Sequence, residues 1–317
     1  MEATAPVSYA SRLRGYARHW KWTLKEYLRW VRGNAWPYFL IYSGLNNLVI
    51  NCTLLPVKAE DLRSVDGLRF DRVDISRAEY DILLAQRSLE AFRRYRFEHS
   101  KVLEYAASRK LLNLDARSVL LDAAGGSGEY LEAIRDIVGC NVLYCNDLLQ
   151  PEKVKNGIHF IGKSVTEIDL PDGSLSAVAC HHSIEHFQGD GDMGFIDEIV
   201  RLLRPGGKAC ILPLFLARPY VEIWNTCRKS KFDEQATTVN DPFATFTGWG
   251  NFEGFARVYD IESFKRRLLS RIPANFTTSL VEVTFEGKAC PQIGFFSNRH
   301  QPPINRAMRA FVIERIQ

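Results

Sequence analysis

A short apolar run, a cluster of glycines and a helical pattern follow one another directly near the middle of the chain. The run 119–121 is typical of a buried strand, and Asp122 ends it. Three of the four residues 125–128 are glycine, and residues 129–138 then repeat apolar side chains at helical spacing. Backbone N–H groups at the start of such a helix can face a ligand, and glycines let that ligand approach the backbone closely. This segment therefore predicts an α/β fold with a ligand bound at the end of a strand.

The next strand-like run, residues 141–146, also ends in an acidic residue, Asp147. It follows the glycine loop by about the 20 residues expected of a carboxylate that binds ribose hydroxyls. The ligand is therefore expected to contain a nucleoside, although the glycines could also simply form a tight turn. The dinucleotide fingerprint requires a third small residue where Leu131 stands, and the Gly-Lys-Ser/Thr of a phosphate-binding loop is missing.

Strand-like and helix-like segments alternate along the rest of the chain, as a doubly wound, mostly parallel sheet requires. We expect strands near residues 118–122, 141–146, 158–161, 175–181 and 207–215, and helices near 128–138, 192–203 and 260–270. Two later runs, residues 277–286 and 309–316, would supply the last two strands.

Two further motifs narrow the class of protein. They are DLPDGSLSAVACHHSIEH at residues 169–186 and RLLRPGGKACILP at residues 201–213. With these motifs the chain resembles the class I S-adenosylmethionine-dependent methyltransferases over residues 100–217, and again over residues 256–269. The resemblance implies a seven-stranded sheet whose last two strands form an antiparallel C-terminal hairpin at the sheet edge. It also implies S-adenosyl-L-methionine as the cofactor and S-adenosyl-L-homocysteine as its product.

The resemblance assigns contacts to the cofactor residue by residue. The methionine end of the cofactor should face Asp122 and the loop backbone, and the ribose should face Asp147. The adenine should lie along Ser164 and Val165, and His181 should lie close to the sulfonium. The full expected set is Asp122, Ala123, Ala124, Gly125, Gly126, Asp147, Leu148, Ser164, Val165 and His181. The chain departs from the family at Ala124, where glycine is usual, and at Lys163-Ser164, where an acidic residue commonly contacts the adenine amino group.

The histidines of the chain are densest just after the fourth predicted strand. His182, Glu185 and His186 are spaced i, i+3, i+4, which on a helix puts them on one face. We name these three as candidate catalytic residues. In one interpretation His182 is a general base that Glu185 or His186 orients, as in the sugar O-methyltransferases that this His-His pair resembles. In another the three bind a divalent metal, which we do not favour and for which we assign no ligand, and in a third they have a structural role only.

Charge and cysteine content limit the partners and the compartment. The net charge is +4, but residues 1–35 hold seven Lys and Arg against two Glu, so the remainder carries −1 and offers no basic surface for nucleic acid. The seven cysteines form no Cys-x-x-Cys pair, and Cys145, Cys180 and Cys210 fall in predicted strands. They indicate small buried residues in a reducing compartment, the cytoplasm.

Two domains are expected: an N-terminal helical extension over residues 1–100, and a methyltransferase domain over residues 101–317 with insertions near 217–255 and 287–306. Residues 11–33 show helical spacing, and residues 35–57 are uncharged but interrupted by proline, glycine and asparagine, so a membrane span is not expected. Residues 11–57 would instead form a lid over the core, or a basic helix at the inner, anionic surface of a membrane.

These features together predict an O-methyltransferase for a sugar, a glycan or another hydroxylated small molecule. A methyltransferase for a lipid or lipid-linked substrate at a membrane, and a non-catalytic cofactor-binding scaffold, are the alternatives. The sequence does not identify the acceptor or the oligomeric state.

Overall fold

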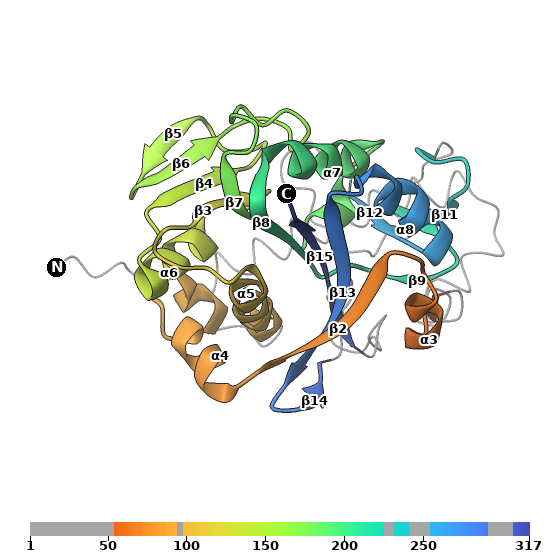
Figure 1. The fold of residues 1–317 in the computed structure, drawn as a ribbon, viewed down its shortest axis with the longest axis horizontal. Helices are drawn as coiled ribbons and strands as arrows, with labels where there is room; N and C mark the ends of the chain where they lie inside the picture. The colour runs from red at the N-terminus through yellow and green to blue at the C-terminus, as the bar shows by residue number, and fades with distance from the viewer. Residues whose placement is uncertain (1–53, 94–97, 225–230, 241–253, 291–306) are drawn as a thin grey trace, which may run out of the picture.

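The computed structural model of the protein describes residues 54–93, 98–224, 231–240, 254–290 and 307–317. Within these residues, ten strands form one sheet in the order β14-β13-β15-β8-β7-β3-β4-β6-β5, with β2 beside β13 (Figure 1). Its strands are β2 (Leu68–Ile75), β3 (Val119–Ala123), β4 (Val142–Asn146), β5 (Lys153–Lys155), β6 (Ile158–Ile161), β7 (Leu175–His181), β8 (Leu203–Leu212), β13 (Phe276–Phe285), β14 (Lys288–Ala289) and β15 (Met308–Arg315). Strands β6, β4, β3, β7 and β8 pair in parallel, which confirms the predicted doubly wound α/β sheet.

The C-terminal strands reverse direction, as predicted. β15 is antiparallel to β8, and β13 is antiparallel to β15 over eight residue pairs. All seven expected strands are present, and the short strands β5 and β14 and the longer β2 extend the sheet beyond them. The largest shift is in β8, which begins at Leu203 directly after the preceding helix instead of at residue 207.

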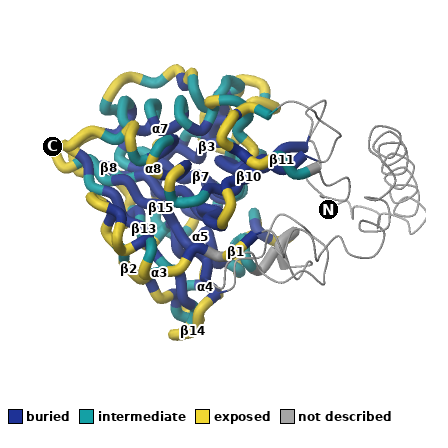
Figure 2. The backbone as a smooth tube through the Cα atoms, turned by 90° about the vertical axis from the view of Figure 1, so that its right-hand side faces the viewer, coloured by how far each residue is buried: buried dark blue, intermediate teal, exposed yellow. Residues whose placement is uncertain are grey.

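Helices cover both faces of the sheet. The elements on one face are α4 (Arg77–Leu84), the 3-10 helix η1 (Arg87–Arg93), α5 (Glu98–Leu112) and α6 (Glu129–Val138); on the other they are α3 (Ala59–Arg63), α7 (Gly191–Leu202), α8 (Ile261–Arg267) and the 3-10 helix η3 (Leu269–Arg271). Val102 of α5 and Ile134 of α6 belong to one buried apolar cluster, whereas Phe195 of α7 and Phe264 of α8 belong to a second. Figure 2 shows the strands mostly buried between these layers.

Residues at the helix ends set the boundaries of α6, which follows the glycine loop, and of α8, which follows the insertion. α6 lies between Gly128 and Gly139, both in the left-handed conformation (φ 85° and 75°) that residues other than glycine rarely adopt. α8 begins with a capping box, in which Asp260 accepts from the Ser263 N–H at 2.8 Å and Ser263 bonds back to the Asp260 N–H.

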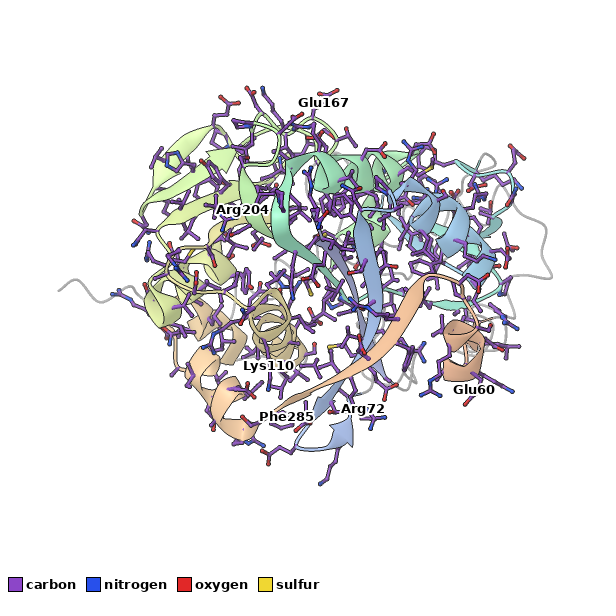
Figure 3. The ribbon with its side chains drawn as sticks, viewed as in Figure 1. Glu60, Arg72, Lys110, Glu167, Arg204 and Phe285 are labelled. Atoms are coloured by element: carbon purple, nitrogen blue, oxygen red, sulfur yellow. The ribbon has the colours of Figure 1, made fainter. Side chains whose placement is uncertain are left out.

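Residues 68–75, which lie within the expected N-terminal helical extension, form strand β2 of the central sheet. β2 pairs in parallel with β13 along its whole length, so the hairpin of β13 and β15 is not the edge that we expected. The strand shows no simple alternation because its apolar residues change face: Leu68 packs in the cluster of α7 and α8, whereas Val73 and Ile75 pack in the cluster of α5 and α6. Lys110 of α5, labelled in Figure 3, donates to the Asp74 carbonyl of this strand at 2.9 Å.

The insertion near residues 217–255 contributes strands to two small sheets, one of two strands and one of three. β9 (Ala217–Arg218) pairs with β1 (Leu55–Pro56), and β10 (Val221–Trp224) lies between β11 (Thr237–Asn240) and β12 (Phe255–Val258). Residues 225–230 and 241–253 of this insertion, residues 291–306 of the second one and residues 11–53 of the expected lid lie outside the described part of the chain. No helix among the described residues combines the length and apolar character needed to cross a membrane.

Candidate functional site

The glycine loop connects β3 to α6 and is hydrogen-bonded to the carboxyl end of β4. Gly125 N–H donates to the Asn146 carbonyl at 3.0 Å, and Gly126 N–H donates to Asp147 Oδ2 at 3.0 Å. A Cβ at position 125 would lie 2.5 Å from Asp122 Oδ2, so a side chain there would displace this carboxylate. Ala124 adopts a left-handed φ of 53°, so alanine occupies a strained position where the family usually has glycine. The loop thus turns sharply around the buried Asp122 carboxylate.

Asp147, the residue expected to bind the ribose, accepts two backbone hydrogen bonds through its carboxylate. Its Oδ2 accepts from Gly126 and its Oδ1 from the Leu149 N–H at 2.9 Å. Leu148 beside it is exposed, with 55% of its surface accessible. The carboxylate therefore lies between the glycine loop and an apolar surface, an arrangement that suits a ribose with a flat base attached.

The segment expected beside the adenine is tied to β4 by a residue that the sequence analysis missed. The Nδ2 of buried Asn146 donates to the carbonyls of Ile161 at 3.2 Å and Lys163 at 2.7 Å. Its Oδ1 has no hydrogen-bond partner in the part of the chain that the structure describes. Ser164 Oγ contacts Thr166 Oγ1 at 2.9 Å. The structure thus brings the ends of β3, β4 and β6 to one edge of the sheet, together with the expected site residues that follow them.

His181 ends β7 and is buried next to Asp122. Its Nδ1 lies 3.4 Å from Asp122 Oδ1, and its ring lies edge-on between Tyr105 and Tyr130, with centroid distances of 4.8 and 4.6 Å. Among the described residues, neither His181 ring nitrogen nor Asp122 Oδ1 has a hydrogen-bond partner. Buried polar atoms are nearly always paired in folded proteins, so these atoms indicate a polar ligand at this position. The Asp122 carboxylate and the His181 imidazole are polar groups that fit the charged methionine end of the expected cofactor.

His182, the next residue, has an entirely different environment. Its φ is 50°, and its ring Nε2 lies 2.8 Å from Oε1 of Glu104 on α5, while Nδ1 lies 3.4 Å from Oε1 of Glu185. Burial of the imidazole lowers its pKa, but the Glu104 and Glu185 carboxylates more than offset this and raise the pKa of His182 to about 9. Burial likewise favours neutral Glu185, yet the neighbouring His182 and His186 lower the pKa of its carboxyl. At neutral pH His182 is therefore an imidazolium between two carboxylates.

His186 does not share a helical face with His182, contrary to the prediction from their spacing. His182 precedes the 3-10 helix η2 (Ile184–His186), whose three residues are too few to form the expected face. His186 Nδ1–H donates to the Phe255 carbonyl of β12 at 2.6 Å, and its Nε2 lies 3.7 Å from Glu185 Oε1. His186 thus connects the site to the inserted sheet.

The described residues contain no group of three His, Cys, Asp or Glu side chains arranged to hold a metal ion. A groove of about 570 Å³ lies elsewhere, between α3 and α8, and includes none of the expected site residues.

The sequence analysis also missed Glu104, because nothing in its helical surroundings shows which neighbour it faces. All five cysteines in the described residues are free and buried, among them Cys145, Cys180 and Cys210 in their predicted strands.

A doubly wound sheet with a glycine loop after β3, an acidic residue after β4 and buried polar groups at the end of β7 is the arrangement typical of α/β proteins that bind a nucleoside-type ligand. Residues 121–211 match the family model for the methyltransferase domain. This match confirms the predicted resemblance to the S-adenosylmethionine-dependent methyltransferases over this segment of the chain.

No curated protein sequence matches the chain. Among solved structures, it is similar to a chain of the complex between a methyltransferase activator and a methyltransferase from Haloferax volcanii, at 12% identity over 75% of this chain and 97% of that one, with a TM-score of 0.45. The 1,6-didemethyltoxoflavin-N1-methyltransferase of Burkholderia thailandensis has 13% identity over 83% and 95% of the two chains and a TM-score of 0.44. A methyltransferase from Listeria monocytogenes has 13% identity over 68% and 100% and a TM-score of 0.42.

Proposed function

We propose that the protein transfers the methyl group of S-adenosyl-L-methionine to a hydroxyl of a small molecule or glycan and releases S-adenosyl-L-homocysteine. The observation that carries this proposal is the juxtaposition at the end of β7. There His181 and Asp122 present unpaired buried polar atoms, and the adjacent His182 supplies a titratable imidazole. The two histidines thus lie where a cofactor and an acceptor would meet at the edge of the sheet.

The cofactor contacts follow from the environment of each expected residue. Asp122 and the loop backbone of residues 123–126 bind the methionine end, and Asp147 binds the ribose hydroxyls. Leu148, Ser164 and Val165 flank the adenine. When bound, the cofactor supplies an electrophilic methyl group, so the residues of the chain mainly align the acceptor with it and exclude water.

His182 is our candidate for the base that accepts the acceptor's hydroxyl proton. An imidazolium cannot accept a proton, so the active form is the fraction of protein in which His182 is neutral. Because the pKa of His182 is raised to about 9, that fraction grows as the pH rises toward 9. Glu185 and His186 are proposed to support the base. Glu185 Oε1 lies 3.4 Å from His182 Nδ1, and His186 Nε2 lies 3.7 Å from the same Glu185 oxygen.

Calorimetric titration with S-adenosylmethionine and S-adenosylhomocysteine tests the cofactor proposal. Mass spectrometry of cell extracts incubated with enzyme and isotopically labelled cofactor tests the acceptor, which should gain one methyl group on oxygen. Cofactor binding without any labelled product in extracts would favour the scaffold alternative. Labelled lipid would favour the membrane alternative, which depends on residues 11–57.

A further inference from the structure

Glu104 is a buried carboxylate from outside the segment that matches the methyltransferase domain. It lies on α5 with 1% of its surface accessible, and its Oε1 is 2.8 Å from His182 Nε2. Burying a carboxylate is costly unless it is paired, so a carboxylate at this depth indicates a specific partner. The short contact to Nε2 identifies that partner as His182.

The charged groups around the imidazole come from two elements. From α5, Lys101 Nζ lies 3.9 Å from Glu104 Oε2 and donates to the His181 carbonyl at 3.0 Å. From η2, Glu185 lies 3.4 Å from Nδ1. His186, also of η2, has its Nε2 3.7 Å from Oε1 of Glu185. The Phe215 ring, centred 5.7 Å away, is an uncharged neighbour.

The two nitrogens of His182 are held unequally. The Glu104 contact has ordinary hydrogen-bond length, whereas the Glu185 contact is long enough for Nδ1 to exchange it for another partner. A carboxylate on one imidazole nitrogen fixes which nitrogen keeps its hydrogen when the ring is neutral. We therefore expect Nε2 to keep its hydrogen in the neutral ring and Nδ1 to be the nitrogen that can accept one.

We propose that Glu104 is the positioning residue for His182: it holds Nε2–H and thereby presents Nδ1 to the hydroxyl of the acceptor. This inference rests on the proposed function, in which His182 is the base. The hydroxyl proton moves to Nδ1 as the acceptor oxygen forms its bond to the methyl carbon, and Glu104 stabilises the imidazolium that results. α5, which precedes the matched domain, is therefore part of the active site.

Nuclear magnetic resonance of the histidine side chains in the full chain tests the pairing without any need for turnover. His182→Gln identifies the His182 signal by its loss. In the wild type we expect a titration midpoint well above 6.5 and, in the neutral form, a hydrogen on Nε2. In Glu104→Gln, removal of an opposite charge in contact should lower the midpoint by about 1 to 3 pH units. Glu282→Gln, which removes a carboxylate paired with Arg72 at 3.3 Å between β13 and β2, is the matched control and should leave the midpoint unchanged.

Kinetics separate positioning from a merely structural role. Glu104→Gln should lower kcat toward the level of His182→Gln, a loss of up to about 100- to 10,000-fold, with little change in KM. Its kcat should reach its plateau at lower pH than that of the wild type. Glu104→Asp keeps the charge and should recover part of the rate.

An unchanged His182 midpoint in folded Glu104→Gln would overturn the proposal. If that variant does not fold, a wild-type midpoint near 6.5, or a neutral ring with its hydrogen on Nδ1, would overturn it equally. Loss of the proposed function has a separate signature: a wild type that binds no S-adenosylmethionine in calorimetry would refute the methyl transfer, while the titration would still decide whether Glu104 controls His182.

Discussion

Two histidines that are adjacent in the sequence have opposite surroundings. His181 ends strand β7 with its ring between two tyrosines, whereas the left-handed backbone of His182 directs the next ring toward Glu104. A non-glycine residue with this φ costs about 1–3 kcal/mol, and such strain persists where surrounding contacts enforce it. The strained position thus places the two adjacent rings in separate environments, one between tyrosines and one against a carboxylate.

At the residue scale, Asp147→Ala should weaken S-adenosylmethionine binding by at least about tenfold. A hydrogen bond to a charged group contributes about 1.5–3 kcal/mol, and the variant also loses the Asp147 contact that holds the Gly126 N–H. Calorimetric titration measures the change in Kd. Asp136→Ala, on the surface of α6, serves as the control, and equal affinity in the two variants would mean that the ribose lies elsewhere.

His182 gives a pH dependence whose direction follows from its raised pKa. Because the neutral ring is the active form, the turnover of the wild type should rise with pH until about 9 and then level off. His182→Ala should lower turnover by at least about 100-fold and leave cofactor affinity little changed. Turnover of the wild type measured from pH 6 to 10 checks the first expectation. A rate that is already constant at pH 7 would contradict the role of His182 as the base.

At the element scale, the inserted small sheet is attached to the core by a buried ionic cluster, defined here as Asp192, Glu222, Asp233, Arg257 and Arg267. Asp192 of α7 contacts Arg267 at 2.6 Å, Arg257 at 3.0 Å and the Tyr259 hydroxyl at 2.8 Å. Arg257 of β12 also reaches Glu222 of β10 at 3.3 Å. The cluster therefore joins α7 to β10 and β12 of the insertion.

Removal of one member of this cluster leaves buried charge without compensation, so Asp192→Ala should lower the free energy of unfolding by about 3–5 kcal/mol. Asp197→Ala is the matched control, because Asp197 lies on the same helix and pairs with Arg271 at the surface, where such a pair contributes about 0–1 kcal/mol. Denaturant unfolding measures both values. Similar losses in the two variants would show that the buried cluster has no special role.

At the scale of the whole molecule, β2 joins the region before residue 100 to the sheet that carries the site. The division of the chain into an extension and a domain remains a prediction, but residues 68–75 belong to the sheet. Ile75 is fully buried at the end of this strand, and Lys110 of α5 pairs with Glu79 of α4 at 2.8 Å just beyond it. We therefore expect the described part of the chain to unfold as one cooperative unit.

Ile75→Ala should lower the stability of the entire protein by about 2–5 kcal/mol, because it opens a cavity in the core that α5 and α6 share. Ile82→Ala, at a site on α4 with 46% exposure, should change stability by no more than about 0.5 kcal/mol. Calorimetric unfolding of both variants should show a single transition. Two transitions, of which only one shifts in Ile75→Ala, would indicate an independent N-terminal unit.

The sequence by itself determined the doubly wound sheet, the glycine loop between β3 and α6, and the positions of Asp122, Asp147 and the His181-His182 pair at the carboxyl ends of their strands. These features depend on neighbours in the chain: apolar periodicity, glycine at left-handed positions, and the rule that parallel strands end at one edge. Only the tertiary structure decided that β2 belongs to the sheet, since its apolar residues divide between two faces and are buried by segments far along the chain. Only it placed Glu104 against His182, 78 residues away, and converted the expected free base into an imidazolium between carboxylates. The charge of a buried side chain depends on which groups surround it in space, and the order of residues does not specify those groups.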